Sequence, residues 1–166
     1  TPLLIVSLTV LVGGMIVHKG IVDEELAIVR TVGSWLMVTG GAMALLSIVT
    51  AWPEVNSMLL VAATALVVFM VFGVFLDMPL LMLSAVVAGA ITTWLATLSI
   101  TAVRSDTRVL IDYFFWGPNA LNFLICSVVA GIVGCLLKSV DHKRAVFLGA
   151  GLICAVSVVI AVAVSI

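Results

Sequence analysis

The sequence predicts an all-α, polytopic transmembrane helical bundle of about six spans, and three observations support this fold class. First, 64% of the 166 residues are hydrophobic and only 9% are charged, whereas charged residues make up roughly a quarter of a soluble domain. Second, the apolar residues form six long runs separated by short polar or proline-containing breaks. Third, the runs are continuously apolar and lack the alternation of a β-barrel strand.

The six runs are candidates for membrane spans, because a helix needs roughly 20 apolar residues to cross a hydrocarbon core about 30 Å thick. The predicted spans are residues 2–17, 31–51, 57–76, 80–103, 120–137 and 145–166. We expect them to form a single transmembrane domain over residues 1–166. The first span is short, and the chain begins and ends in apolar sequence, as expected of a fragment cut from a longer membrane protein.

The breaks between the spans have physical causes. Proline lacks a backbone N–H and pushes the preceding residue out of helical space, so Pro53 is predicted to end the second span. Pro79 acts in the same way between the third and fourth spans, where Asp77 and Met78 leave room only for a tight antiparallel hairpin. Residues 139–144 are predicted to be a short polar turn.

Basic residues, which favour the cytoplasmic side of a membrane, are concentrated in the loops that follow the odd-numbered spans. Those loops hold five Lys or Arg residues, against two in the loops after the second and fourth spans. The five are Lys19, Arg30, Lys138, Lys143 and Arg144, and the two are Arg104 and Arg108. The odd-numbered loops are therefore predicted to be cytoplasmic.

The charge and the reactive residues disfavour several classes of protein. The net charge of −1 gives no electrostatic reason to expect nucleic acid as a partner. His18 and His142 both lie in predicted loops, and the three cysteines have no metal-ligand spacing. No ionisable side chain stands clearly at the middle of a predicted span, and GxSxG and HExxH motifs do not occur. We expect no metal, no cofactor and no enzymatic activity, with the lipid bilayer of a bacterial or archaeal cell membrane as the surroundings.

Hydroxyl side chains in the fourth span are the first candidates for residues that line a path. Thr93, Thr97 and Thr101 recur every four residues, so they share one face of a helix. They either line a polar path or donate back to the carbonyl four residues earlier, which is common in apolar helices and is the favoured interpretation. Asp77 is a further candidate because it stands between two long apolar spans, although its position in a tight turn favours a solvated carboxylate.

Residues 112–119 combine four consecutive aromatic side chains with a proline and an asparagine. The aromatic residues are Tyr113, Phe114, Phe115 and Trp116. They cannot all share one face of a helix, so they are predicted to be an interfacial anchor, and a segment bordering a substrate path is the alternative. Asn119 is predicted to cap the following helix through its side-chain oxygen. Asn122, one turn later, would place a second amide near the opening of such a path. Trp94 departs from interfacial placement, because it falls well inside the fourth span.

Glycine residues are spread through the predicted spans. Glycine lets helix backbones approach closely, and this packing drives helix association in lipid. We therefore expect the glycines at helix–helix contacts within the bundle, with an interface to another subunit as the alternative.

Three functions fit these observations. The first is a small transporter or channel component that moves an uncharged or small solute, with a cavity reaching the midplane near Thr93 and Thr97. A homo-oligomer would supply wall area that six helices lack. The second is a non-catalytic membrane subunit or anchor of a larger complex, in contact with other membrane subunits and without a cavity. The third is the membrane-embedded fragment. The transporter is preferred. It would be contradicted by a structure in which the fourth and fifth spans pack against each other with no path between them.

Overall fold

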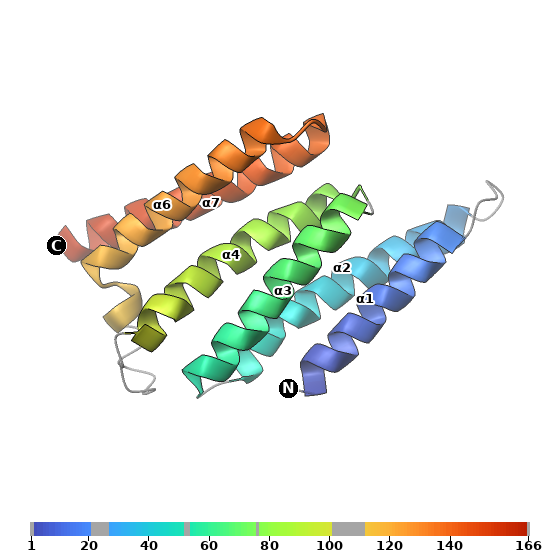
Figure 1. Ribbon diagram of the computed structural model, residues 1–166, viewed down its shortest axis with the longest axis horizontal. Coiled ribbons are helices and arrows are strands. Elements are labelled where there is room, and N and C mark those ends of the chain that lie inside the picture. Colours follow the sequence, from blue (N-terminus) through green and yellow to red (C-terminus); the bar gives the residue numbers. More distant parts are fainter. Residues whose placement is uncertain (1, 21–26, 52–53, 76, 101–111, 166) are drawn as a thin grey trace. The chain divides into compact units, whose positions relative to one another are not determined.

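A computed structural model of the chain describes residues 2–20, 27–51, 54–75, 77–100 and 112–165 (Figure 1). The long elements in these ranges are α1 (Pro2–Gly20), α2 (Ala27–Thr50), α3 (Val55–Phe75), α4 (Pro79–Ile100), α6 (Gly117–Leu136) and α7 (Val140–Ser165). The described residues form no β-strand. The predicted all-α fold class is confirmed.

Five helical stretches are long and apolar enough to cross a membrane. They are residues 31–50 of α2 together with α3, α4, α6 and α7. The sixth helix, α1, contains a shorter apolar stretch, Ile5–Gly14. These helices match the bundle of about six spans that the sequence predicts, and the chain is a multi-pass membrane protein.

The chain divides into two compact units, Thr1–Ala51 and Trp52–Ile166. In the first unit, α1 and α2 pack against each other as an antiparallel pair (Figure 1). A Cβ atom added at Gly40 would lie 2.8 Å from the backbone nitrogen of Leu11, and one at Gly14 would lie 2.9 Å from the carbonyl oxygen of Gly33. Neither position has room for a methyl group, so the predicted role of glycine in close helix packing is confirmed at both.

The second unit consists of two helical hairpins, α3–α4 and α6–α7, and α4 packs against α7 as well as against α3. The two helices α4 and α7 approach closely at Gly149, where an added Cβ would lie 2.9 Å from the Cγ1 atom of Val86. Gly73 makes a similar approach to Met82 within the α3–α4 hairpin. The central helix of this unit is therefore α4.

Hydrogen bonds between side chains and neighbouring helices supplement this packing. In lipid such bonds join helices because no water competes for them. Within the α6–α7 hairpin, Ser157 Oγ donates to the carbonyl oxygen of Ala120 at 2.6 Å and Ser127 Oγ donates to that of Ala150 at 2.8 Å. In the α3–α4 hairpin, Ser99 Oγ donates to Asn56 Oδ1 at 2.8 Å.

The α3–α4 turn is as tight as the sequence predicts. Met78 N donates to the carbonyl oxygen of Gly73 at 3.1 Å, and Asp77 between them has a φ of 55°. This is a Schellman-type helix end, in which one left-handed residue lets the chain reverse. Aspartate occupies the position that glycine usually fills, and it tolerates the left-handed region better than most residues.

The polar turn predicted over residues 139–144 is shorter in the structure, because α7 begins at Val140. Lys143 N donates to the carbonyl oxygen of Ser139 at 3.0 Å. Asp141 stands in the first turn of the helix, where a carboxylate complements the positive end of the helix dipole. The prediction was wrong here because a polar segment outside the hydrocarbon can still be helical.

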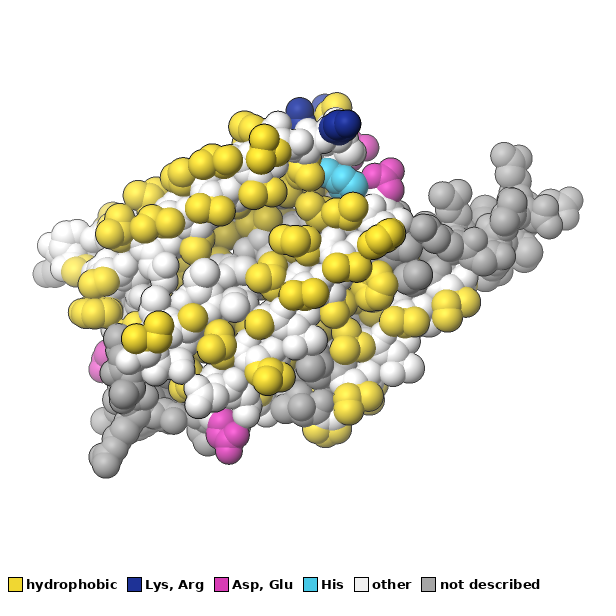
Figure 2. All heavy atoms as spheres, in the orientation of Figure 1, with side chains coloured by type: hydrophobic (Ala, Val, Ile, Leu, Met, Phe, Trp, Pro, Cys, Tyr) yellow, Lys and Arg dark blue, Asp and Glu magenta, His cyan; other side chains and the backbone are white. Residues whose placement is uncertain are grey.

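Side chains on the outer faces of the helices are largely apolar, and Figure 2 shows hydrophobic atoms covering the flanks of the helices. Exposed residues of α6 and α7 include Leu121, Val128, Leu148 and Val159. The charged side chains described in the second unit stand beyond the ends of the apolar stretches. Glu54 and Asp112 lie at one end, and Asp77 and residues 138–144 lie at the other. This distribution suits a lipid-facing surface between two aqueous ends.

Candidate functional site

The threonine hydroxyls of α4 are bonded to the backbone of their own helix. Thr92 Oγ1 donates to the carbonyl oxygen of Ala88 at 2.7 Å, and Thr97 Oγ1 donates to that of Trp94 at 2.7 Å. Thr93 Oγ1 lies 2.9 Å from the carbonyl oxygen of Ala90. Bonding back to the same helix is the interpretation favoured from the sequence, although Thr97 and the shorter bond of Thr93 use the carbonyl three residues earlier instead of four. These bonds satisfy hydroxyl groups for which hydrocarbon offers no partner. Thr101 lies outside the described residues.

Thr93 also reaches across to α6. Its Oγ1 lies 3.1 Å from the Sγ atom of Cys126, so one polar contact bridges α4 and α6 near the middle of both helices. Asn122 stands four residues before Cys126, one turn away on the same face of α6. The sequence pointed to Thr93 and Asn122 separately. Cys126 was not predicted to be a site residue, although its spacing of four residues from Asn122 places both side chains on one face of a helix.

These residues border a cavity of about 370 Å³ that we call the Thr93 cleft. Its polar lining residues are Thr92, Thr93, Asn122 and Cys126. Its apolar lining residues are Leu66, Met70, Met82, Ala85, Val86, Gly89, Ala90, Ile125, Val129, Ala130, Val133 and Val146. The volume falls within the range of roughly 300–1,000 Å³ found for small-molecule sites, which are likewise mostly apolar with a few polar groups.

The Thr93 cleft runs along the helices rather than across them. On α4 its lining extends from Met82 to Thr93, and on α6 from Asn122 to Val133. At 1.5 Å per residue, each stretch covers about 16 Å, which is about half of a hydrocarbon core 30 Å thick. The cavity therefore lies between α4 and α6 along this stretch. Thr97 does not line the cleft.

The aromatic segment is divided between the interior and the surface. Tyr113 is buried, and Phe114 packs against Trp94 and Phe123, with ring centroids 5.5 and 5.8 Å apart. Phe115 and Trp116 are exposed. The segment begins as a helical turn over residues 112–114, which sends successive side chains in different directions, as the sequence predicts for four adjacent aromatics.

The predicted cap at Asn119 is wrong. The N-cap of α6 is Trp116, which makes no side-chain capping bond, and a proline occupies the first turn. The side-chain amide of Asn119, which is 2% exposed, instead donates to the carbonyl oxygen of Tyr113. Because Asn119 is already inside the helix, its side chain reaches back to the aromatic segment and holds it against the start of α6.

Asp77 lies apart from the Thr93 cleft. Its side chain is 84% exposed at the α3–α4 turn, and its Oδ1 lies 3.3 Å from Nε2 of the buried His142. This contact joins the α3–α4 turn to the first turn of α7. No pattern in the sequence indicates this contact, because the pairing depends on how the two hairpins meet.

A second cavity of about 310 Å³ lies on another side of α4, and we call it the Trp94 pocket. Its lining residues are Val87, Ala90, Ile91, Trp94, Phe114, Phe123, Leu152, Ile153 and Val156. Ala90 also lines the Thr93 cleft. The two cavities therefore share one small wall residue.

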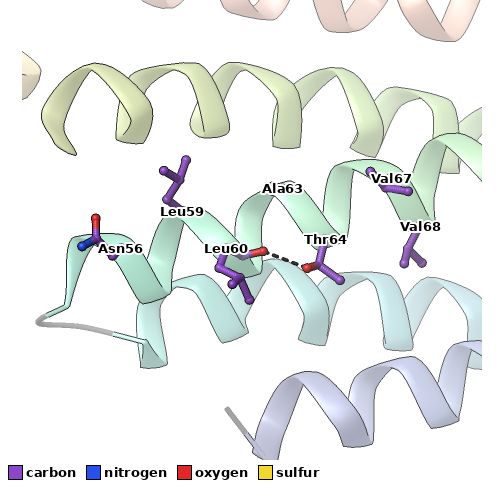
Figure 3. A pocket seen from close by; sticks show the side chains of 7 residues that line it. All are labelled: Asn56, Leu59, Leu60, Ala63, Thr64, Val67 and Val68. Carbon is purple, nitrogen blue, oxygen red and sulfur yellow. Dashed lines mark hydrogen bonds between the residues drawn. The ribbon is translucent and has the colours of Figure 1, made fainter. Parts of the chain in front are cut away.

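A third hollow lies along the outer face of α3 (Figure 3). All of its described lining residues come from that one helix, from Asn56 to Val68. Its two polar side chains already have partners: Thr64 Oγ1 donates to the carbonyl oxygen of Leu60 at 2.8 Å, and Asn56 Oδ1 accepts from Ser99. One helix face cannot enclose a ligand, so this hollow is not a candidate site.

Among the described residues, no group of three or more His, Cys, Asp or Glu side chains could hold a metal ion. Comparisons of the chain with models of known protein families, with curated proteins and with solved structures found no match in any of the three. What is shown is a multi-pass helical membrane protein with two cavities beside α4.

Proposed function

We propose that the chain is a small transporter or channel component for an uncharged, weakly polar solute, and that the Thr93 cleft is part of the solute's path. The single observation that carries this proposal is a cavity of about 370 Å³ at the middle of α4 and α6. We also propose that the chain has no enzymatic activity and binds no cofactor.

The lining of the Thr93 cleft supports an uncharged solute. No Asp, Glu, Lys, Arg or His is among the described residues that line it, so a bare charge there would have no partner among them, and burying one in hydrocarbon costs at least about 2.5–3.5 kcal/mol. The Asn122 amide and the Cys126 thiol offer weak polar contacts to a small neutral molecule.

Cys126 provides a direct test, because thiols react with maleimides as thiolates and a water-soluble maleimide must arrive through water. A variant with Cys135→Ser and Cys154→Ser keeps Cys126 as its only cysteine. The matched control, with Cys126→Ser and Cys135→Ser, keeps Cys154, which lines neither cavity. In proteoliposomes we expect Cys126 to react several-fold faster than Cys154, and labelling of Cys126 to slow the influx of glycerol or urea measured by light scattering.

The second candidate is a non-catalytic subunit, in which the Thr93 cleft seats a helix of another membrane chain. The back-bonded hydroxyls and the mostly apolar lining favour this alternative. It predicts that Cys126 is as unreactive toward the water-soluble maleimide as Cys154, and that vesicles with and without protein take up both solutes equally fast. That result would reject the transport proposal.

A further inference from the structure

The polar lining of the Thr93 cleft is confined to one of its ends. Thr93 Oγ1 lies 3.1 Å from Cys126 Sγ at that end, and Asn122 stands one turn from Cys126 on α6. At the opposite end Met82 packs with Val146, and every described lining residue there is apolar. A cavity that is polar at one end and apolar along the rest matches an amphiphile with a polar head and a hydrocarbon chain.

Asn122 gives the polar end of the cleft hydrogen-bonding groups that have no partner in the protein. The residue is half-buried and lines the cleft. None of the described residues forms a hydrogen bond with its side-chain amide, and they enclose neither polar atom of that amide. Asn122 stands about 8 Å along α6 from Gly117, at 1.5 Å per residue, and an unpaired amide at such a depth in hydrocarbon is costly. A donor and an acceptor are therefore available to an occupant of the cleft.

The apolar part of the cleft can be entered from the lipid. Met70 on α3 and Val129 on α6 line the cleft and are also exposed. Between these helices, α4 contributes Gly89, where an added Cβ would lie 3.6 Å from Leu66 Cδ1, in ordinary contact. A molecule dissolved in the hydrocarbon of the bilayer can therefore reach the cleft sideways.

The dimensions and charge of the cleft specify the rest of the occupant. The lining of α4 from Met82 to Thr93 covers about 16 Å. Carbon–carbon bonds of about 1.5 Å advance an extended alkyl chain by about 1.3 Å per carbon, so about 12 carbons span this length. No charged side chain is among the described residues that line the cleft, so the head must be uncharged.

We propose that the Thr93 cleft binds an unbranched alkyl chain of about 12 carbons with an uncharged hydroxyl head, and that the Asn122 amide forms a hydrogen bond with this hydroxyl. The chain lies along α4 and α6, and its far end reaches Met82 and Val133. The proposal goes beyond transport and does not depend on the movement of a solute, although it concerns the same cavity. Either proposal can therefore fail without the other.

Two photoreactive derivatives of 1-dodecanol test the site and the orientation of its occupant. One carries a diazirine near the hydroxyl, and the other carries it near the end of the chain. The intact chain in lipid nanodiscs is irradiated with each probe, and the adducts are mapped by peptide mass spectrometry. The first probe should label residues 122–126 and the second Val133 or Val146, and excess 1-dodecanol should suppress both. Labelling spread evenly over the lipid-facing residues, or labelling that excess 1-dodecanol does not suppress, would overturn the proposal.

The role of the Asn122 amide is tested by Asn122→Leu, which removes the amide at similar volume. A hydroxyl left without a partner in the cleft predicts that saturable labelling by the alcohol probes falls about fivefold or more. Labelling by a probe in which a methyl group replaces the hydroxyl should not change. Equal labelling of the wild type and Asn122→Leu by the alcohol probes would contradict the assignment of the head to Asn122.

Gly89→Leu fills the cleft and should abolish saturable labelling by all the probes. Gly131→Leu on α6 is the matched control, because Gly131 is not among the described residues that line the three cavities, and an added Cβ there would meet nothing within 4 Å. Unchanged helicity by circular dichroism checks the folding of both variants. Saturable labelling that survives in folded Gly89→Leu, or that is lost equally in folded Gly131→Leu, would contradict the location of the site.

Discussion

At the scale of single residues, Asp77 is subject to two opposing effects. Its backbone lies in the left-handed region, with a φ of 55°, where glycine would be free of steric cost. Its carboxylate lies 3.3 Å from His142 Nε2, and yet that nitrogen makes no hydrogen bond of acceptable geometry. The distance allows an ion pair if the imidazole is protonated, but the geometry does not add a directed bond. With the carboxylate 84% exposed, solvent screens the pair, so its contribution is at most about 1 kcal/mol.

Substitution of Asp77 separates these effects. Asp77→Gly removes the backbone cost and should leave thermal stability in detergent equal or slightly higher. Asp77→Asn keeps tolerance of the left-handed region and loses only the charge, so a small decrease is expected. Asp77→Ala should be the least stable, by about 1 kcal/mol relative to Gly, because it has neither advantage. If all three variants are destabilised equally, the contact with His142 outweighs the backbone term.

At the scale of helices, the contact between α4 and α7 depends on the size of one side chain. An added Cβ at Gly149 would lie 2.9 Å from Val86 Cγ1 and 3.0 Å from its Cβ, whereas at Gly151 it would meet nothing within 4 Å. Val86 is β-branched and stiff at χ1, so it cannot simply rotate away. The two glycines, two residues apart on α7, thus have different roles.

Alanine at these two positions should have opposite effects. Gly149→Ala forces α4 and α7 apart and should destabilise the chain by about 1–3 kcal/mol, as overpacked cores do. Gly151→Ala should be neutral or stabilising by up to about 1 kcal/mol, because alanine favours helix. Thermal unfolding in the same detergent measures both. Equal destabilisation of the two variants would mean that glycine at position 149 is not needed for the close approach.

Helix existence was predictable and helix partnership was not. Continuous apolar runs and the prolines at positions 53 and 79 mark the spans, because hydrocarbon admits only internally bonded helices. The start of α7 and the bond from Asn119 to Tyr113 depend on local geometry at helix ends, which residue type alone does not determine. The meeting of Thr93 with Cys126, and the place of Asn122 on the wall of the Thr93 cleft, depend on the rotation and separation of α4, α6 and α7. The rotation and separation of helices cannot be predicted from the spacing of residues along the sequence.

At the scale of the whole molecule, charge is asymmetric between the two ends of the second unit. Among its described residues, the end that contains the α3–α4 and α6–α7 turns holds Lys138, Lys143 and Arg144 together with Asp77 and Asp141, and the opposite end holds Glu54 and Asp112. Figure 2 shows basic side chains gathered at one end of the helices. These basic residues are among those from which the odd-numbered loops are predicted to be cytoplasmic; Arg104 and Arg108 lie outside the described residues, and the orientation stays a prediction.

Orientation can be tested with single cysteines in a background in which the three native cysteines are serine. Ser139→Cys places a thiol between α6 and α7, and Asp112→Cys places one at the opposite end. A membrane-impermeant maleimide added to intact cells should label Asp112→Cys, and should label Ser139→Cys only after the membrane is permeabilised. The reverse pattern would show that the positively charged end faces outward.

The back-bonded hydroxyls of α4 also have a consequence for biosynthesis. About 40 residues separate the end of α4 from the start of α7, so at 5–20 residues per second the ribosome needs about 2–8 seconds to reach the start of α7. During that interval the face of α4 that later meets α7 is covered by lipid. Thr92, Thr93 and Thr97 have already satisfied their hydroxyls within α4, so the waiting helix exposes no unpaired donor from these side chains. The α3–α4 hairpin can thus remain in the bilayer until the second hairpin arrives.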